Sequence, residues 1–401
     1  MPALPKNPLE ARIVLTNVGY FLREFSISQT KYTPPGKSEI EFADHVVLVG
    51  DQLFLIQSKN REAPSSDAER EAKWYRENVK SHAVKQIRST LAQLASAPPF
   101  PNDRDEATHI PRDLGRLTVF KIVIYNMGSA LPESLRRRKH RVDEEAGFVH
   151  FFHVDDYELV LRTMATLPEV TDYLSYREET LKRQEAAGMV TERALLGGYL
   201  RFAEVIEPRE EHAEFVDRLH VDGDAFDISG ILHSYRDKIY KHYAEGADPA
   251  DLHTHSVLGP YYAVLRQLLR LNRSGLAEFK KRYIWGRDCC EQEFEHPSMF
   301  AMIDREHGHS DGFVFIPIPK GTNTVGAGNA LRNLTELAKH RLQVDRALGV
   351  SFRRDGTDFL IDWALIERPW TPDAEFDEIL RTRNPFRPLT EGVQPRYHFR
   401  P

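Results

Sequence analysis

Residues 42–59 read Phe42-Ala-Asp-His-Val-Val-Leu-Val-Gly-Asp-Gln-Leu-Phe-Leu-Ile-Gln-Ser-Lys59. Two apolar runs, rich in β-branched residues, lie on either side of Gly50-Asp51-Gln52, which predicts a tight hairpin between two buried strands. Because side chains alternate along a strand, Gln57 and Lys59 should share one face, and the hairpin should bring Asp44 back beside them. We expect these three polar groups to converge at one edge of a sheet.

The composition is that of an ordinary globular protein with room for two or three domains. The chain has 401 residues, of which 41% are hydrophobic and 28% are charged. No apolar segment resembles a signal peptide or a membrane span, so we expect a cytoplasmic protein without a membrane partner. The two cysteines, Cys289 and Cys290, are adjacent, which fits a reducing compartment and excludes a cysteine-based zinc site.

The basic residues are concentrated in the first third of the chain. The net charge is −6, yet residues 1–150 hold 22 Lys and Arg against 19 Asp and Glu, a balance of +3. The helical pattern from residue 72 to 94 carries five cations, one of them Arg76, and Arg136-Arg-Arg-Lys139 is a second cluster. We expect nucleic-acid phosphates to contact Lys73, Lys80, Lys85, Arg88, Arg136, Arg137 and Arg138. A solvated helix face and a surface loop are the alternative interpretation.

The pattern of predicted elements indicates a mixed α/β protein in three parts. A helix over residues 8–24 with Asn7 as its N-cap, the hairpin, a long helix over 68–96 and two further strands near 117–125 and 147–153 predict a sheet flanked by helices. This makes a first domain of residues 1–165. A mainly helical region, 166–300, and a small C-terminal α/β unit, 301–401, should follow, and we expect the part after residue 165 to mediate homo-oligomerisation or protein binding.

Glu10 on the leading helix, Asp44 at a strand and Gln57-Ser-Lys59 on the paired strand resemble the PD-(D/E)XK nuclease superfamily in its Gln-x-Lys, Mrr-like variant. The likeness covers roughly residues 8–153. It implies a restriction-endonuclease-like fold and magnesium-dependent hydrolysis of phosphodiester bonds in DNA, in restriction or anti-phage defence. The chain departs from the family pattern in two ways: no proline precedes Asp44, and a glutamine replaces the second acid.

The chemistry of phosphodiester hydrolysis explains this combination of residue types. Mg²⁺, for which Mn²⁺ can substitute, prefers oxygen ligands and activates a bound water. The resemblance assigns the metal to Asp44, Gln57, the carbonyl of Ser58, and Glu10. Lys59 would orient or deprotonate the attacking water and offset charge on the phosphate. Three other acids could take the place of Glu10: Glu24, Glu39 or Glu41.

Two other functional hypotheses remain open at this point. Gln57 could mark a nuclease-derived module that has lost activity and serves as a nucleic-acid-binding or scaffolding part of a larger complex. A separate hydrolase centre could use the His-x-His segments, Asp251-Leu-His-Thr-His255 and His307-Gly-His309-Ser-Asp311.

Overall fold

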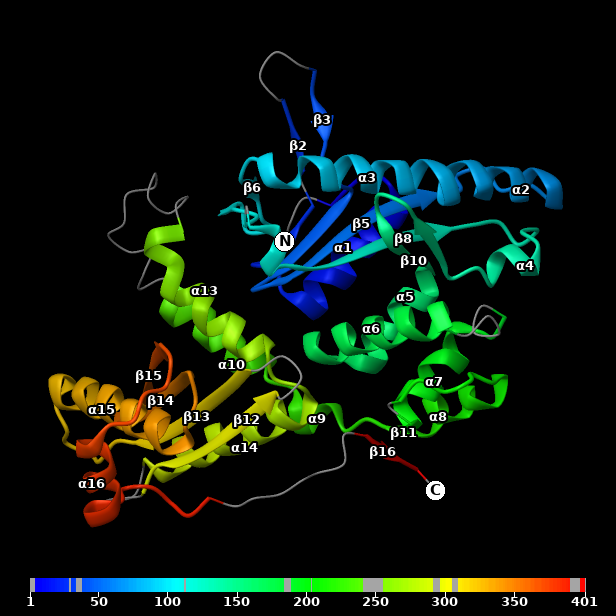
Figure 1. The fold of residues 1–401 in the computed structure, drawn as a ribbon. Helices are drawn as coiled ribbons and strands as arrows, with labels where there is room; N and C mark the ends of the chain where they lie inside the picture. The colour runs from blue at the N-terminus through cyan, green and yellow to red at the C-terminus, as the bar shows by residue number, and fades with distance from the viewer. Residues whose placement is uncertain are drawn as a thin grey trace. The chain divides into compact units, whose positions relative to one another are not determined.

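The computed structural model describes residues 4–28, 30–33, 38–111, 113–183, 189–202, 204–240, 255–290, 296–304, 309–389 and 397–400. Its elements are labelled in Figure 1. The chain divides into two compact units. The first comprises Met1–Val221, Gly246–Val257 and Tyr397–Pro401, and the second comprises Asp222–Glu245 and Leu258–Arg396. Each contains its own sheet, and within the described residues no helix has both the length and the apolar character needed to span a bilayer.

The first unit is built on a six-stranded mixed sheet, as the sequence predicted. Its three central strands are parallel, and the outer strands run antiparallel to their neighbours. Across the sheet the order is β1 (Ser26–Ile27), β4 (His45–Val49), β5 (Gln52–Asn60), β8 (Thr118–Asn126), β10 (Gly147–His153) and β9 (His140–Asp143).

The predicted hairpin is confirmed as β4 and β5. His45 pairs with Ile56 and Val49 pairs with Gln52, which leaves a two-residue turn. Gly50 in that turn has φ of +62°, a conformation that favours glycine because it has no Cβ. All five residues of β4 are buried, so both strands are held in the interior of the unit.

Helices cover both faces of this sheet (Figure 1). On one face, α1 (Pro8–Phe21) packs on β4 and β5 and α5 (Val154–Met164) packs on β8 and β10. Asn7 caps α1 as predicted, because its side chain accepts a hydrogen bond from the amide of Leu9. The opposite face is covered by one continuous helix made of α2 (Ala68–Trp74), the π-helical segment η1 (Tyr75–Ala83) and α3 (Val84–Gln93).

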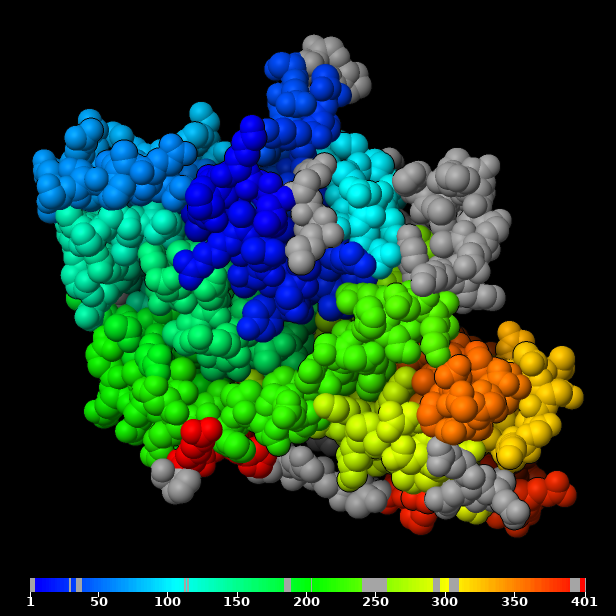
Figure 2. Space-filling view, turned by 180° about the vertical axis from the view of Figure 1, so that it is seen from behind, coloured from blue at the N-terminus to red at the C-terminus, as the bar shows by residue number. Residues whose placement is uncertain are grey.

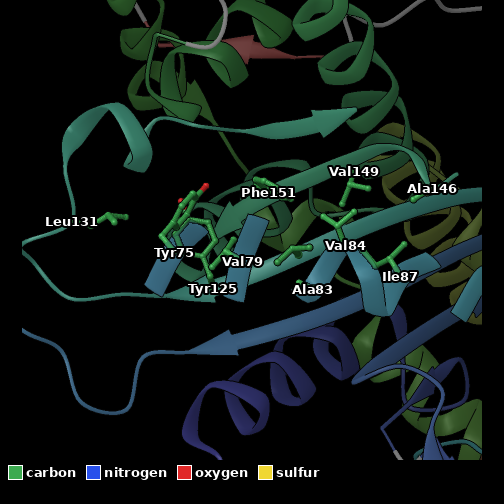
Figure 3. Packing of buried hydrophobic residues seen from close by; sticks show 11 residues of the cluster. Tyr75, Val79, Ala83, Val84, Ile87, Tyr125, Leu131, Ala146, Val149 and Phe151 are labelled. Atoms are coloured by element: carbon green, nitrogen blue, oxygen red, sulfur yellow. The ribbon is translucent and has the colours of Figure 1, made fainter. Parts of the chain in front are cut away.

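The buried side of this long helix forms a hydrophobic core with β8 and β10. Figure 3 shows Tyr75 and Val79 of the helix packed toward Tyr125 of β8, and Ile87 on the side of Val149 of β10. These five side chains are no more than 1% exposed. The apolar spacing of the helix therefore places its opposite, charged side toward solvent.

The boundary predicted at residue 165 falls inside the first unit. Helices α6 (Leu167–Arg183) and α7 (Glu192–Phe202) belong to the same unit as the six-stranded sheet. Arg177 of α6 is fully buried and donates to the carbonyl of Phe151 in β10 at 2.9 Å. This buried polar contact ties the helices to the sheet, and the first compact unit extends through Val221.

Short elements complete the first unit. They are β2 (Lys31–Tyr32), β3 (Ile40–Glu41), η2 (Leu94–Ser96), β6 (Phe100–Pro101), β7 (Ala107–Thr108), η3 (Leu114–Arg116), α4 (Glu133–Arg136), η5 (Glu210–His212), α8 (Ala213–Arg218), β11 (Leu219–His220) and β16 (His398–Phe399). The last two pair with each other, so the C-terminal strand joins the first unit rather than the second.

The second unit is a smaller α/β structure, and the predicted division at residue 300 falls inside it. Its sheet has the order β12 (Ser298–Asp304), β13 (His309–Pro317), β14 (Arg346–Asp355) and β15 (Asp358–Glu367), with β13 and β14 parallel. β14 and β15 form a hairpin in which Asp355 pairs with Asp358, so that Gly356 and Thr357 make the turn.

Helices pack on the sheet of the second unit. α14 (Arg273–Cys289) and α15 (Thr324–Leu342) contact the central strands β13 and β14. The helices are α9 (Gly223–Phe226), α10 (Ser229–Tyr235), η6 (Arg236–Tyr240), α13 (His255–Leu269), α14 (Arg273–Cys289), α15 (Thr324–Leu342) and α16 (Ala374–Arg383). The protein is therefore mixed α/β, with an N-terminal sheet flanked by helices, then a helical region, then a small sheet.

Candidate active site

The hairpin brings Asp44 and Lys59 together at the edge of the first sheet. Asp44 immediately precedes β4, and Lys59 is the penultimate residue of β5. The Lys59 Nζ lies 4.0 Å from the Asp44 Oδ2, and the two side chains are only 14% and 11% exposed. Because both groups are largely removed from water, their charges interact more strongly than those of a surface pair would.

Ser58 holds the Asp44 carboxylate in place. The backbone amide of Ser58 donates to the Asp44 Oδ2 at 2.5 Å, and its hydroxyl donates to the same oxygen at 2.9 Å. The carbonyl of Ser58 accepts a hydrogen bond from the Lys59 ammonium at 2.8 Å. One carboxylate oxygen is therefore fixed by protein donors. The carbonyl expected to bind a metal instead orients the lysine, although its second lone pair leaves room for another partner.

Gln57 presents an unsatisfied oxygen on the same strand. Its side chain is 3% exposed, and its Oε1 is buried without a hydrogen-bond partner among the described residues. Continuing the pairing of His45 with Ile56 by one position places Gln57 opposite Asp44. A buried amide oxygen without a partner costs free energy, so this atom is suited to accept a hydrogen bond from a water or to bind a cation.

Glu10 of α1 lies in the electrostatic field of the same groups. Its pKa is raised, first by burial and then by the charges of Asp44 and Glu41. Asn7, the N-cap of α1, donates to the Glu10 Oε1 at 3.0 Å and so orients the carboxylate. The structure thus brings the predicted Glu10 near Asp44.

The acids that could have replaced Glu10 lie in different environments. Glu41 in β3 has a raised pKa, caused first by burial and then by Asp44. Glu24, in contrast, forms an ion pair of 3.1 Å with Arg104. Glu41 is therefore a further acid of this site and Glu24 is a structural residue. The sequence signal for Glu41 was its position only three residues before Asp44.

Burial also changes the basicity of Lys59. Its pKa is lowered by desolvation, an effect that Asp44, Glu41 and Glu10 partly offset. A desolvated lysine with a lowered pKa can take a proton from water more readily at neutral pH than a solvated lysine can. His45, the neighbour of Asp44, has its pKa lowered to about 4 by burial and is a neutral core residue.

The donor set fits a hard cation that keeps several waters. No group of three or more His, Cys, Asp or Glu side chains that could hold a metal ion occurs in the part of the chain that the structure describes. Asp44, the unpartnered oxygen of Gln57, and Glu10 are nevertheless the oxygen donors that Mg²⁺ prefers, and Mg²⁺ commonly uses only one or two carboxylates. The arrangement does not suit a structural zinc site, which is closed by four ligands that are mostly Cys and His.

The predicted nucleic-acid contacts fall into two groups. Several of the cations already have carboxylate partners, namely Lys73 with Glu77 at 4.0 Å, Arg88 with Asp143 at 3.7 Å, Arg136 with Glu133 at 3.9 Å, and Arg137 with Glu133 at 2.8 Å and Glu210 at 3.2 Å. Lys80, Lys85 and Arg138 form no ion pair within the described residues. These three are therefore the predicted cations that remain open to phosphate.

The His-x-His segments lie largely beyond what the structure describes. Residues 251–254 and 305–308 are outside the described residues. The hypothesis of a second hydrolase centre depends on these residues and stays a prediction.

No match was found for this chain. The comparisons covered models of protein families, curated proteins and solved structures.

Proposed function

We propose that the protein is a magnesium-dependent nuclease of the PD-(D/E)XK type, with a Gln-x-Lys motif, that hydrolyses phosphodiester bonds of DNA. The observation that carries this proposal is the buried 4.0 Å approach of Lys59 to Asp44, beside the unpartnered Oε1 of Gln57. A role in restriction or anti-phage defence follows from the resemblance of the motif alone.

Each residue has a distinct part in the proposed reaction. Asp44, with one oxygen held by Ser58, and Gln57 would hold the cation, and Glu10 would add negative charge. When bound, Mg²⁺ lowers the pKa of a water and neutralises charge on the phosphate. Lys59, fixed by the Ser58 carbonyl, would take the proton from the attacking water.

Cleavage of supercoiled plasmid DNA in the presence of Mg²⁺ or Mn²⁺ tests this proposal. Asp44→Asn and Lys59→Met should each lower the cleavage rate by at least about 100-fold, a typical loss for a residue in acid–base or electrostatic catalysis. Asp51→Asn, in the exposed hairpin turn, is the matched control and should cleave as the wild type does. Equal rates for the wild type and both site variants, with every metal tested, would refute the proposal.

The second candidate is a binding module without nuclease activity. It is favoured by the glutamine at position 57, since no set of three acids that could hold a metal occurs within the described residues. This alternative predicts DNA binding that a chelator does not change and no cleavage by the wild type. Gln57→Glu, which restores a second carboxylate, would then raise metal affinity, measurable by calorimetry.

A further inference from the structure

A groove lined by positive charge lies at the β9 side of the first unit. Its volume is about 490 Å³, and Arg76 and Lys80 of η1 line it together with Arg138, His140 and Arg141. In the space-filling view the light-blue helix α2–η1 lies directly against the teal segment that contains α4 and β9 (Figure 2). Residues more than 50 positions apart in the sequence therefore form one surface.

The geometry of η1 places two of these cations on the same side of the helix. Arg76 and Lys80 are four residues apart, and in π-helical geometry with its wider turn such residues lie one above the other. Arg141 of β9 donates to the carbonyl of Lys80 at 2.7 Å, which fixes the strand against the helix. The groove is thus built by rigid elements rather than by loose surface side chains.

The positive charge of the groove is only partly neutralised. None of the described residues that line it is an aspartate or a glutamate. Lys80 and Arg138 have no carboxylate partner within the described residues. Arg76 has only an exposed partner, Glu69, at 3.0 Å, and Arg141 pairs with Asp143 at 3.6 Å. The pKa of Lys80 is lowered, chiefly by the charge of Arg138 and then by burial, which shows that like charges repel each other here. A bound anion would relieve this repulsion.

The groove lies at the same end of the strands as the candidate active site. Lys59 pairs with Tyr125, and Tyr125 pairs with His153, so the three form one row across β5, β8 and β10. Continuing the register of β9 places Arg138 opposite Phe152, within one residue of this row. Three strand spacings of about 4.8 Å separate Arg138 from Lys59, a distance of about 14 Å.

We propose that this groove binds backbone phosphates of the nucleic-acid substrate, about four base pairs from the bond cleaved at Asp44 and Lys59. The spacing follows from about 14 Å across the sheet and a rise of about 3.4 Å per base pair. The proposal rests on the proposed nuclease function for its substrate. It assigns Arg76, Lys80, Arg138 and Arg141 to substrate positioning and not to the chemical step.

Binding of a fluorescent DNA duplex, measured by anisotropy in a chelator at several salt concentrations, tests the groove without cleavage. The double variant Lys80→Gln/Arg138→Gln should lose about tenfold in affinity, and the slope of log K against log salt should fall by about 1.8, because two phosphate contacts are removed. Neither side chain has an ion pair in the described structure, so melting temperatures should stay equal. Arg70→Gln/Arg162→Gln, with the same charge change at two exposed positions of the first unit outside the groove, is the control.

The outcomes separate this inference from the proposed function. Equal losses in both double variants, or none in either, would overturn the groove as a specific phosphate site, even if the wild type cleaves DNA. A selective loss in the groove variant supports it, even if no metal activates cleavage and the nuclease proposal fails. Inorganic triphosphate is the second probe: if the groove variant loses triphosphate binding but keeps duplex binding, the groove is a small-anion site and the inference is overturned.

Discussion

Replacing Arg177 by methionine should destabilise the first unit more than any change to a surface ion pair. Arg177 is 0% exposed, and its guanidinium donates to both carboxylate oxygens of Glu192, at 2.8 and 3.0 Å. It also contacts the His150 Nδ1 at 3.0 Å and lies 4.0 Å from the ring of Phe152. Its loss leaves the buried carboxylate of Glu192 without its cation.

The size of the effect follows from this burial. Breaking a buried ion pair by removing one partner costs about 3–5 kcal/mol, whereas an exposed pair contributes about 0.2–1 kcal/mol. With about 2–4 °C per kcal/mol for a unit of this size, Arg177→Met should lower the melting temperature by about 6–20 °C. Arg12→Met is the matched control, because Arg12 pairs with Asp155 at 2.8 Å and with Glu158 on the surface, where its side chain is 42% exposed.

Circular dichroism during thermal unfolding and urea titration of the full chain measure both variants. A double variant, Arg177→Met/Glu192→Met, should recover much of the lost stability, since apolar residues often replace a buried ion pair without net cost. The reasoning is refuted if Arg177→Met is no more destabilising than Arg12→Met, or if the double variant is less stable than Arg177→Met alone.

Three further results should follow from the structure. The free energy of unfolding should fall by up to about 3 kcal/mol as the pH drops from about 6.5 to about 4. The reason is that His45 stays neutral in the folded protein, with a pKa of about 4, whereas in the unfolded chain it binds a proton at the ordinary histidine pKa. Urea titration of His45→Gln should show a smaller fall. Asp67→Ala should cost about 1 kcal/mol in the same assay, because Asp67 caps α2. Gly197→Ala should destabilise the first unit, since a Cβ would lie 1.8 Å from the His212 carbonyl oxygen, whereas Gly19→Ala has open space and should be neutral or stabilising; equal melting temperatures would contradict this.

Local sequence signals were sufficient for the hairpin and the long helix. Gly50 between two apolar runs specifies a turn that other residues would strain, and the hairpin alone returns Asp44 to Lys59. The apolar spacing from residue 68 to 96 predicts a helix whatever lies against it, although it did not reveal the π-helical segment. Such features depend on neighbours within a few residues, so they can be inferred from the chain directly.

The extent of the first unit and the partners of its charges depended on packing between distant segments. The sequence does not show that Arg177 joins the sheet through Phe151, nor that Arg137 is neutralised by Glu210 while Arg138 faces a groove. The local sequence around two adjacent arginines is nearly the same. Their environments differ because charges take partners through space, and burial and distance, which set the strength of these interactions, exist only once the segments have packed together.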